Sequence, residues 1–424
     1  MTGFGRIVLA KPPERADLNF GTFSLAVLAA AVRDLCEPVV LDLTTRTVAA
    51  ATGAILAERP ELVGITAMGL PSVAAVADLV RSLRREGGED LAIVAGGHGA
   101  GNLPGHLLAA GADAVLPGEA ERSFRSLVRL GLGTEGPGLV LPDGEGVRAT
   151  PPAAPIDPLD DLPRPARDLM PVPGDGIYLL ETSRGCPHGC TFCETTRFHG
   201  RRWRPRSPAR VVDEVRELVV DHDAWIVHFA DDNFTADPRR VIAICELMGD
   251  GPRPAMCMAS ARADDLARCP ELLPAMAEAG ILRVSLGVET LSDALAGSIG
   301  KPIPLDTYRG VFERMRQLGM FSVASFIVGL PGETPGQRAD LLATALEAAP
   351  DSAWFLPFLP LPGTPAAAGR ATFDPHATDV AEARRLDVAF AADAAVRARL
   401  ESAVRAGGIR GTLARGSLAQ AARR

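Results

Sequence analysis

The chain has 424 residues, enough to bury more than one hydrophobic core, which disfavours a small single-core fold. Apolar residues make up 47% of it and charged residues 23%, values that exclude disordered, collagen-like and coiled-coil chains. The 44 basic and 52 acidic residues give a net charge of −8, whereas nucleic-acid-binding proteins typically carry a net positive charge. We therefore expect no nucleic-acid partner.

The N-terminal residues do not have the pattern of a signal peptide, because Lys11, Glu14 and Asp17 interrupt the region where an apolar core is needed. The apolar run 23–32 is too short to cross a bilayer. We expect a cytoplasmic protein without a membrane span. Seven cysteines are an odd number, and three lie within eight residues, which favours metal or redox chemistry over a disulfide framework.

The first 130 residues alternate short apolar strands with helical stretches. The expected strands are 6–10, 39–43, 62–66, 91–95 and 114–116. The expected helices are 25–35, 48–57, 72–84 and 103–109. Crossovers of this length predict an α/β domain with a parallel sheet, Rossmann-like or flavodoxin-like, whose ligand would lie at the carboxyl ends of the strands. Gly96, Gly97, Gly99 and Gly118 fall at those ends, although tight turns alone would also need glycines there.

A second series of strands and helices follows a segment rich in proline and glycine. The expected strands are 177–182, 225–229, 255–260, 283–287, 322–328 and 353–357. The expected helices are 208–220, 238–247, 271–279, 307–318 and 336–348. Six such units predict a partial (β/α)6 TIM-type barrel with its functional residues at the carboxyl ends of the strands.

These patterns divide the chain into four parts. The expected parts are a Rossmann-like domain (1–135), an extended linker (136–175), the barrel (176–370) and a short helical tail (371–424). Within the tail, 379–406 is expected to be helical and 407–424 to be frayed.

Three cysteines, Cys186, Cys190 and Cys193, follow the first strand of the barrel. Three soft thiolates on one loop suit an iron-sulfur cluster, and stopping at three leaves one iron with an open coordination position. The alternative is a zinc ion held by these cysteines with His188 or His199. Cys245, Cys257 and Cys269 lie far apart in sequence and are expected to be buried thiols.

The Cys-x-x-x-Cys-x-x-Cys spacing, with Phe192 before the last cysteine, resembles the signature of the radical S-adenosylmethionine (SAM) superfamily. Later motifs resemble, in order, the branch of that superfamily with an N-terminal cobalamin-binding domain. They are 229–237, 261–264, 285–290 and 326–334, with 62–66, 94–98 and 116–121 in the N-terminal half. The resemblance implies a 4Fe-4S cluster on the three cysteines, SAM on its unique iron, and release of a 5′-deoxyadenosyl radical on reduction.

The resemblance also implies two sets of cofactor contacts. For SAM they are Phe192, Asp231, Asp232, Arg262, Glu289, Gly329 and Gly332. For cobalamin they are Thr66, Met68, Gly97, His98, Gly118 and Glu119. The alternatives are an ion pair at Glu289, a helix cap after residue 230, a simple turn at Gly329 and core packing of Phe192. The chain has no Asp-x-His-x-x-Gly motif, so the resemblance implies cobalamin held without a histidine ligand to cobalt.

The function that this resemblance implies is a cobalamin-dependent radical SAM C-methyltransferase, acting on an unactivated carbon of a small or medium metabolite. One alternative is a radical SAM dehydratase, decarboxylase or ring-forming enzyme whose N-terminal domain does not use cobalamin. Another is a non-catalytic iron-sulfur or corrinoid sensor. The expected partners are a small-molecule substrate and an electron donor such as flavodoxin or ferredoxin. The sequence assigns no catalytic side chain.

Overall fold

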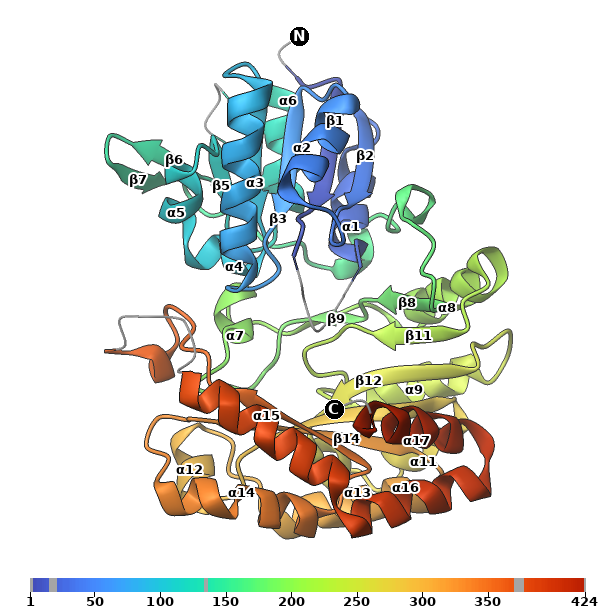
Figure 1. The fold of residues 1–424 in the computed structure, drawn as a ribbon. Helices are drawn as coiled ribbons and strands as arrows, with labels where there is room; N and C mark the ends of the chain where they lie inside the picture. Colours follow the sequence, from blue (N-terminus) through green and yellow to red (C-terminus); the bar gives the residue numbers. More distant parts are fainter. Residues whose placement is uncertain (1–2, 15–20, 133–135, 370–376, 423–424) are drawn as a thin grey trace. The chain divides into compact units, whose positions relative to one another are not determined.

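The chain forms two compact units, Met1–Pro173 and Gly174–Arg424, in the computed structural model (Figure 1). The structure describes residues 3–14, 21–132, 136–369 and 377–422. In this described part, no helix combines the length and the hydropathy that a membrane-spanning segment requires.

The first unit is built on a parallel sheet with the order β2-β1-β3-β4-β5, as the alternating pattern predicts. Its strands are β1 (Arg6–Lys11), β2 (Glu37–Asp42), β3 (Leu62–Thr66), β4 (Ala92–Gly96) and β5 (Ala114–Leu116). This is the flavodoxin-like order, in which the direction of winding reverses between β1 and β3. Ligands of such sheets bind outside the carboxyl ends of the strands at this reversal.

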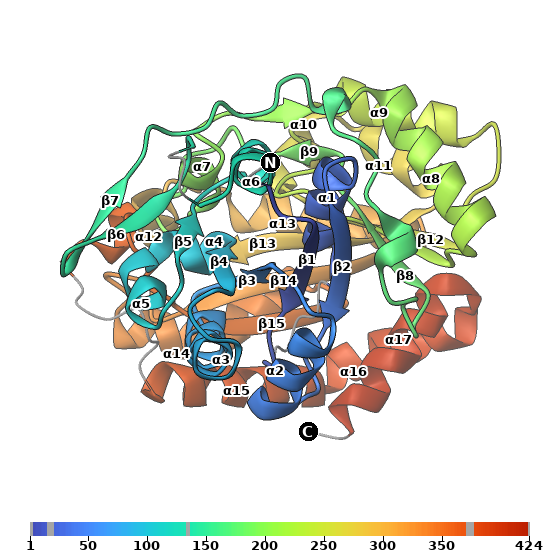
Figure 2. The same cartoon turned by 90° about the horizontal axis from the view of Figure 1, so that it is seen from above.

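Helices cover both faces of this sheet (Figure 2). On one face lie α1 (Phe23–Val32) and α6 (Glu121–Leu130), and on the other α2 (Val48–Ala57) and α3 (Ser72–Gly87). Two short helices, α4 (His98–Asn102) and α5 (Pro104–Ala109), follow β4. The sequence gives local reasons for these elements, since the Thr47 side chain caps α2 and α3 buries one apolar stripe.

The predicted linker, 136–175, is only partly a linker. Strands β6 (Val140–Asp143) and β7 (Gly146–Ala149) form an antiparallel hairpin that extends the sheet beyond β5. Gly144, with φ of +57°, allows the tight turn between them. The proline-rich remainder contains only the 3-10 turns η1 (Leu159–Asp161) and η2 (Arg167–Leu169), and the Ala166 amide donates to the Ala26 carbonyl of α1. This segment therefore packs as part of the first unit.

The second unit contains six parallel strands in sequential order. They are β8 (Ile177–Leu180), β11 (Ile226–Phe229), β12 (Met256–Ala261), β13 (Ile281–Glu289), β14 (Phe321–Val328) and β15 (Ser352–Pro357). The described strands leave the sheet open between β8 and β15, so the fold is the expected partial barrel. A small antiparallel pair, β9 (Ser183–Arg184) and β10 (Arg204–Pro205), stands beside it.

Helices pack on one face of this sheet and bury alternate residues of its strands, among them Val227, Cys257 and Val284. These helices are α8 (Pro208–His222), α9 (Pro238–Met248), α10 (Ala263–Arg268), α11 (Leu272–Glu278), α13 (Leu305–Gln317) and α14 (Pro335–Ala348), whereas α7 (Thr195–Phe198) and α12 (Asp293–Ser298) lie in the loops after β9 and β13. Side chains of Ser207, Asp237 and Thr334 cap α8, α9 and α14, each followed by proline in the first turn.

The tail contains three helices, α15 (Ala377–Ala392), α16 (Ala394–Ala406) and α17 (Gly408–Ala421). The expectation that 407–424 is frayed is wrong for the described residues, because α17 packs against α16. A Cβ atom on Gly411 would come within 2.7 Å of the Ala403 carbonyl oxygen, so the missing side chain permits this close approach. Ala414 is fully buried in the core of the unit.

Candidate active site

The three clustered cysteines lie on the loop after β8 and β9 in the second unit. The loop is fixed by backbone hydrogen bonds: the Cys193 amide donates to the Cys190 carbonyl, and the Thr191 amide to the Ile299 carbonyl at the end of α12. Gly185 enters the loop with φ of +82°, and a Cβ atom there would lie 2.1 Å from the Arg202 carbonyl oxygen. Only glycine fits at that position.

Asp231, at the carboxyl end of β11, holds the start of this loop. Its carboxylate accepts hydrogen bonds from the amides of Thr182 and Ser183 at 2.7 and 3.1 Å, and from both of their hydroxyl groups. Burial raises the pKa of Asp231, and the hydrogen bonds from Thr182 oppose that effect. Because its oxygens are occupied within the protein, the geometry favours a positioning role over the SAM contact that the resemblance implies.

Asp232 points to the other side of the same loop. Its carboxylate accepts from the Gly185 amide at 3.2 Å and from the Thr195 hydroxyl at 2.9 Å, and it lies 3.7 Å from His199 Nε2. The side chain remains 31% exposed, so it is open to further contacts. The next residue, Asn233, is buried and donates to the Asp265 carboxylate at 3.0 Å.

The thiols lie in a partly buried, charged environment. Burial raises the pKa of the Cys186 thiol to about 11 and also raises that of Cys193, and the nearby Asp232 carboxylate acts in the same direction. Arg262, at the end of β12, brings Nη1 to 3.8 Å from Cys190 Sγ. Its other guanidinium nitrogens bind the Asp264 carboxylate at 2.9 and 3.0 Å, which orients the cation towards the thiol.

Glu289 ends β13 with φ of +67°, a conformation that is uncommon for a residue with a side chain. Its carboxylate forms an ion pair with Lys301 at 2.9 Å, and both residues are buried. A Cβ atom on Gly287 would lie 2.2 Å from the Glu289 carboxylate and 2.7 Å from Lys301 Nζ. The pair therefore occupies the space that the missing side chain of Gly287 leaves.

Gly329 and Gly332 follow β14, both with positive φ. The Gly329 amide donates to the Glu333 carboxylate at 2.9 Å. Arg338 of α14 bridges Glu333 and Asp379 of α15, at 2.7 and 2.8 Å. This charged bridge ties the loop after β14 to the start of the C-terminal helices.

Phe192, between two of the cysteines, is partly buried against a small apolar cluster. The buried members of the cluster are Leu295, Ile299, Leu330 and Phe358. They come from the ends of α12 and the loops after β14 and β15, so the aromatic ring lies among the strand-end loops.

In the first unit, Thr66, Met68 and Gly97 lie together at the carboxyl ends of β3 and β4. The Thr66 hydroxyl is 3.5 Å from Met68 Sδ, and the Ser24 hydroxyl of α1 is 3.8 Å from the same sulfur. A Cβ atom on Gly97 would lie 2.6 Å from the Ala67 carbonyl oxygen.

The loops after β3 and β4 also approach each other closely at Gly99. A Cβ atom on Gly99 would lie 2.2 Å from the Gly69 carbonyl oxygen, so the loops after β3 and β4 meet backbone to backbone. His98 begins α4, while Gly118 and Glu119 follow β5, with φ of +77° at Gly118. Because parallel strands end at one edge of the sheet, all six residues expected at cobalamin belong to that edge.

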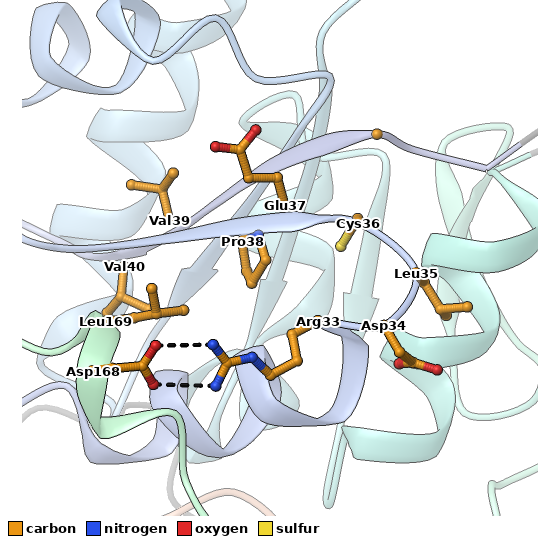
Figure 3. A pocket seen from close by; sticks show the side chains of 11 residues that line it. Arg33, Asp34, Leu35, Cys36, Glu37, Pro38, Val39, Val40, Asp168 and Leu169 are labelled. Atoms are coloured by element: carbon orange, nitrogen blue, oxygen red, sulfur yellow. Dashed lines mark hydrogen bonds and ion pairs between the residues drawn. The ribbon is translucent and has the colours of Figure 1, made fainter.

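A groove elsewhere in the first unit does not belong to this edge (Figure 3). It lies at the amino end of β2, where Arg33 forms two hydrogen bonds with Asp168 at 3.1 and 2.9 Å. Cys36 and Glu37 line it from the start of the strand. We assign it no part in cofactor binding, because ligands of such sheets bind at the opposite ends of the strands.

Comparison with known families supplies the identity of both units. The model of the radical SAM superfamily matches residues 180–345, and the model of the B12 binding domain matches residues 15–128. The chain therefore carries a radical SAM domain and, N-terminal to it, a B12-binding domain.

Relatives of this radical SAM enzyme cover much of its length. An uncharacterized methyltransferase of Pyrococcus horikoshii is 29% identical over 85% of this chain and 82% of the relative. The anaerobic magnesium-protoporphyrin IX monomethyl ester cyclase of Rubrivivax gelatinosus is 29% identical over 72% of this chain and 57% of the cyclase. The solved structure of the radical SAM methyltransferase TsrM from Kitasatospora setae, 21% identical, covers 85% of this chain and 75% of TsrM with a TM-score of 0.72, which establishes a common fold.

The residues of the radical SAM domain fit a 4Fe-4S cluster in their chemistry. They offer three thiols on one rigid loop, and Arg262 places positive charge beside Cys190, where it would stabilise a thiolate. Within the described residues, no three His, Cys, Asp or Glu side chains are grouped to hold a single metal ion. The assignment of Cys186, Cys190 and Cys193 as cluster ligands remains a proposal.

The structure adds residues that the sequence does not single out. Lys301, Glu333 and Asp379 complete charged contacts at the strand ends, and Thr182 and Ser183 anchor Asp231. The only local signal is that Lys301 is a cation in an apolar context between Gly300 and a proline. Its partner lies twelve residues earlier, on another element.

Proposed function

We propose that this chain is a cobalamin-dependent radical SAM C-methyltransferase that acts on an unactivated carbon of a small or medium metabolite. The main support for this proposal is that one chain contains both a B12 binding domain and a radical SAM domain. The 29% identity to the uncharacterized methyltransferase of Pyrococcus horikoshii, over 85% of this chain, also supports it.

When bound, SAM on a 4Fe-4S cluster supplies a 5′-deoxyadenosyl radical, and methylcobalamin supplies the methyl group. The chain's own residues hold and orient these groups. Cys186, Cys190 and Cys193 would bind the cluster, with their loop fixed by Asp231. The strand-end residues Asp232, Arg262 and Glu289, with Phe192, Gly329 and Gly332, are proposed to surround SAM.

The cobalamin contacts are proposed from the loops at the carboxyl ends of β3, β4 and β5. At Gly97 and Gly99 the loops after β3 and β4 pack backbone to backbone, and a side chain at either position would push these loops apart. No histidine motif for cobalt is present, so cobalamin would be held by packing and hydrogen bonds.

A second candidate function is a ring-forming radical reaction. It is favoured by the 29% identity to the Rubrivivax gelatinosus cyclase over 72% of this chain. The two candidates differ in what becomes of SAM, since only the methyltransferase would transfer its methyl group to the substrate.

Two partners complete the proposal. One is a small-molecule substrate, and the other is an electron donor, flavodoxin or ferredoxin, which reductive cleavage of SAM requires. The thiols must stay reduced to bind a cluster, so we propose a cytoplasmic location.

The experiment is anaerobic reconstitution with iron, sulfide and hydroxocobalamin, followed by desalting and metal analysis. We expect about four irons and one cobalt per chain for a single cluster of this type and one corrinoid. The reconstituted protein, given dithionite and SAM, should form 5′-deoxyadenosine, and Cys190→Ala should abolish this. Arg239→Gln, on the exposed side of α9, is the matched control and should leave both unchanged.

The outcomes separate the candidates. Four irons with one cobalt, and transfer of label from methyl-labelled SAM to cobalamin, support the methyltransferase. Four irons without cobalt favour the ring-forming reaction. A chain that binds neither iron nor cobalt contradicts both.

A further inference from the structure

The face of the barrel sheet opposite helices α8 to α14 carries an unusual row of side chains. The cross-strand register aligns Leu179, His228, Met258 and Arg283, from β8, β11, β12 and β13. Each sits next to a residue that packs on the opposite, helix-covered face, so the four side chains share the inner face. The row lies one residue before the ends of β8 and β11, three residues before the end of β12 and six residues before the end of β13, so Arg283 lies deeper in the sheet than the strand-end loops.

Arg283 is the charged member of this row and is only partly exposed. Its guanidinium carbon lies 5.6 Å from the centre of the Trp354 ring of β15, a cation–π contact. Nη1 lies 3.7 Å from Met258 Sδ. Across the described part of the chain, no carboxylate forms an ion pair with Arg283, and burial lowers its pKa.

The cations at the strand ends of this unit differ from Arg283, because each of them has a carboxylate partner. Arg262 is bound by Asp264, and Lys301 by Glu289. A cation that is held in place by an aromatic ring and a thioether, without an anion, retains most of its hydrogen-bonding capacity for a ligand.

The wall between Arg283 and the carboxyl ends of the strands is made of small residues. Ser260 and Ser285 are paired across β12 and β13, and Gly287 faces Ser325 of β14. For the residues that the structure describes, none of these three hydroxyl groups has a hydrogen-bond partner. Side chains that are small and carry hydroxyl groups without a partner would offer polar contacts to a molecule bound beside Arg283.

The charges of Arg283 and His228 indicate which class of ligand would bind beside them. Arg283 contributes one positive charge, and burial together with that charge lowers the pKa of His228 to about 4, so His228 is neutral near pH 7. One cation matches a singly charged anion better than a doubly charged phosphate. The planar guanidinium also matches the two oxygens of a carboxylate.

We propose that Arg283 binds a carboxylate group of the substrate, with Trp354 and the serines of the inner face packing around the rest of that molecule. The inference rests on the proposed function in that it names the substrate class for the same radical SAM domain. Arg283 would hold the substrate by its carboxylate deep on the inner face of the sheet, which leaves a carbon farther along the molecule, towards the strand ends, for the reaction.

The test compares two probes of nearly equal shape, phenylacetate and its neutral amide, phenylacetamide. Binding to the full chain is measured by calorimetry. We expect phenylacetate to bind at least tenfold more tightly than phenylacetamide. Arg283→Gln should remove this preference by weakening phenylacetate alone, whereas the control Arg239→Gln should preserve it. Equal binding of the two probes, no saturable binding of phenylacetate, or a preference that survives Arg283→Gln would overturn the proposal.

A second measurement does not depend on the folding of Arg283→Gln. Replacing Trp203 and Trp225 by phenylalanine leaves Trp354 as the only tryptophan in the chain. Phenylacetate should change its fluorescence with the same dissociation constant as in calorimetry, and an unchanged signal at saturation contradicts the proposal. Neither assay needs iron or cobalt. A failure of the proposed function would therefore appear in metal content and methyl transfer, and a failure of this inference in probe binding.

Discussion

Charged side chains at the ends of the barrel strands are bound by partners within the protein. Asp231 accepts hydrogen bonds from Thr182 and Ser183, and Glu289 is paired with Lys301. Each of these carboxylates fixes a loop that the proposed cofactor site needs. A substitution that removes one partner of a buried ion pair lowers stability, because the other partner remains as a buried, uncompensated charge.

We predict that Lys301→Met lowers the free energy of unfolding of the second unit by about 3 kcal/mol, because Glu289 would remain buried without its cation. The double variant with Glu289→Gln should recover most of this loss. Urea unfolding followed by tryptophan fluorescence measures it, since Trp203, Trp225 and Trp354 all belong to the second unit. Equal losses in the single and double variants would show that the ion pair does not account for the effect.

At the scale of elements, the last helix is part of the barrel unit rather than an appendage. Arg410 of α17 forms an ion pair at 2.5 Å with Asp351, which is 1% exposed and precedes β15. Asp351 also accepts from the Ser322 amide and hydroxyl at the start of β14, at 3.0 and 3.2 Å. The helix thereby neutralises a carboxylate that links two strands of the sheet.

We predict that Arg410→Met lowers the free energy of unfolding of the second unit by about 2 to 3 kcal/mol, because Asp351 loses its cation while it stays buried. Arg415→Met is the matched control, since Arg415 is exposed on the same helix and should change stability by less than about 0.5 kcal/mol. The same fluorescence assay applies. Similar values for the two variants would mean that Asp351 does not depend on α17.

For the whole molecule, the two units have separate hydrophobic cores and separate candidate cofactor sites. The cysteine loop belongs to the second unit, and the strand-end loops around Gly97 and Gly99 to the first. Binding of iron and binding of cobalt should therefore be separable by single substitutions.

We predict that Cys190→Ala loses iron and keeps cobalt, whereas Gly99→Ala loses cobalt and keeps iron. A methyl group at residue 99 would clash with the Gly69 carbonyl oxygen and separate the two loops. Gly53→Ala is the control for the first unit, because no atom lies within 4 Å of the added group and the residue is in helix α2. Metal analysis after reconstitution measures both. Loss of both metals in either variant would show that the units do not bind independently.

The sequence alone predicts much of this protein, because the deciding features are local. Alternating apolar runs indicate the parallel strands of both sheets, and three cysteines within eight residues indicate the iron-sulfur chemistry. Spacing along the chain encodes these features directly, since neighbours in sequence remain neighbours in the fold. The family signature depends on the same short-range pattern.

The tertiary structure decides what depends on contacts between distant residues. Thr182 meets Asp231 across 49 residues, and Arg410 meets Asp351 across 59. The hairpin of β6 and β7 forms because β5 offers an edge, and α17 is ordered because Gly411 fits against α16. Only the structure shows that the register of four strands places Arg283 on the inner face beside Trp354. Such pairings depend on how whole elements pack, which no local pattern of residues specifies.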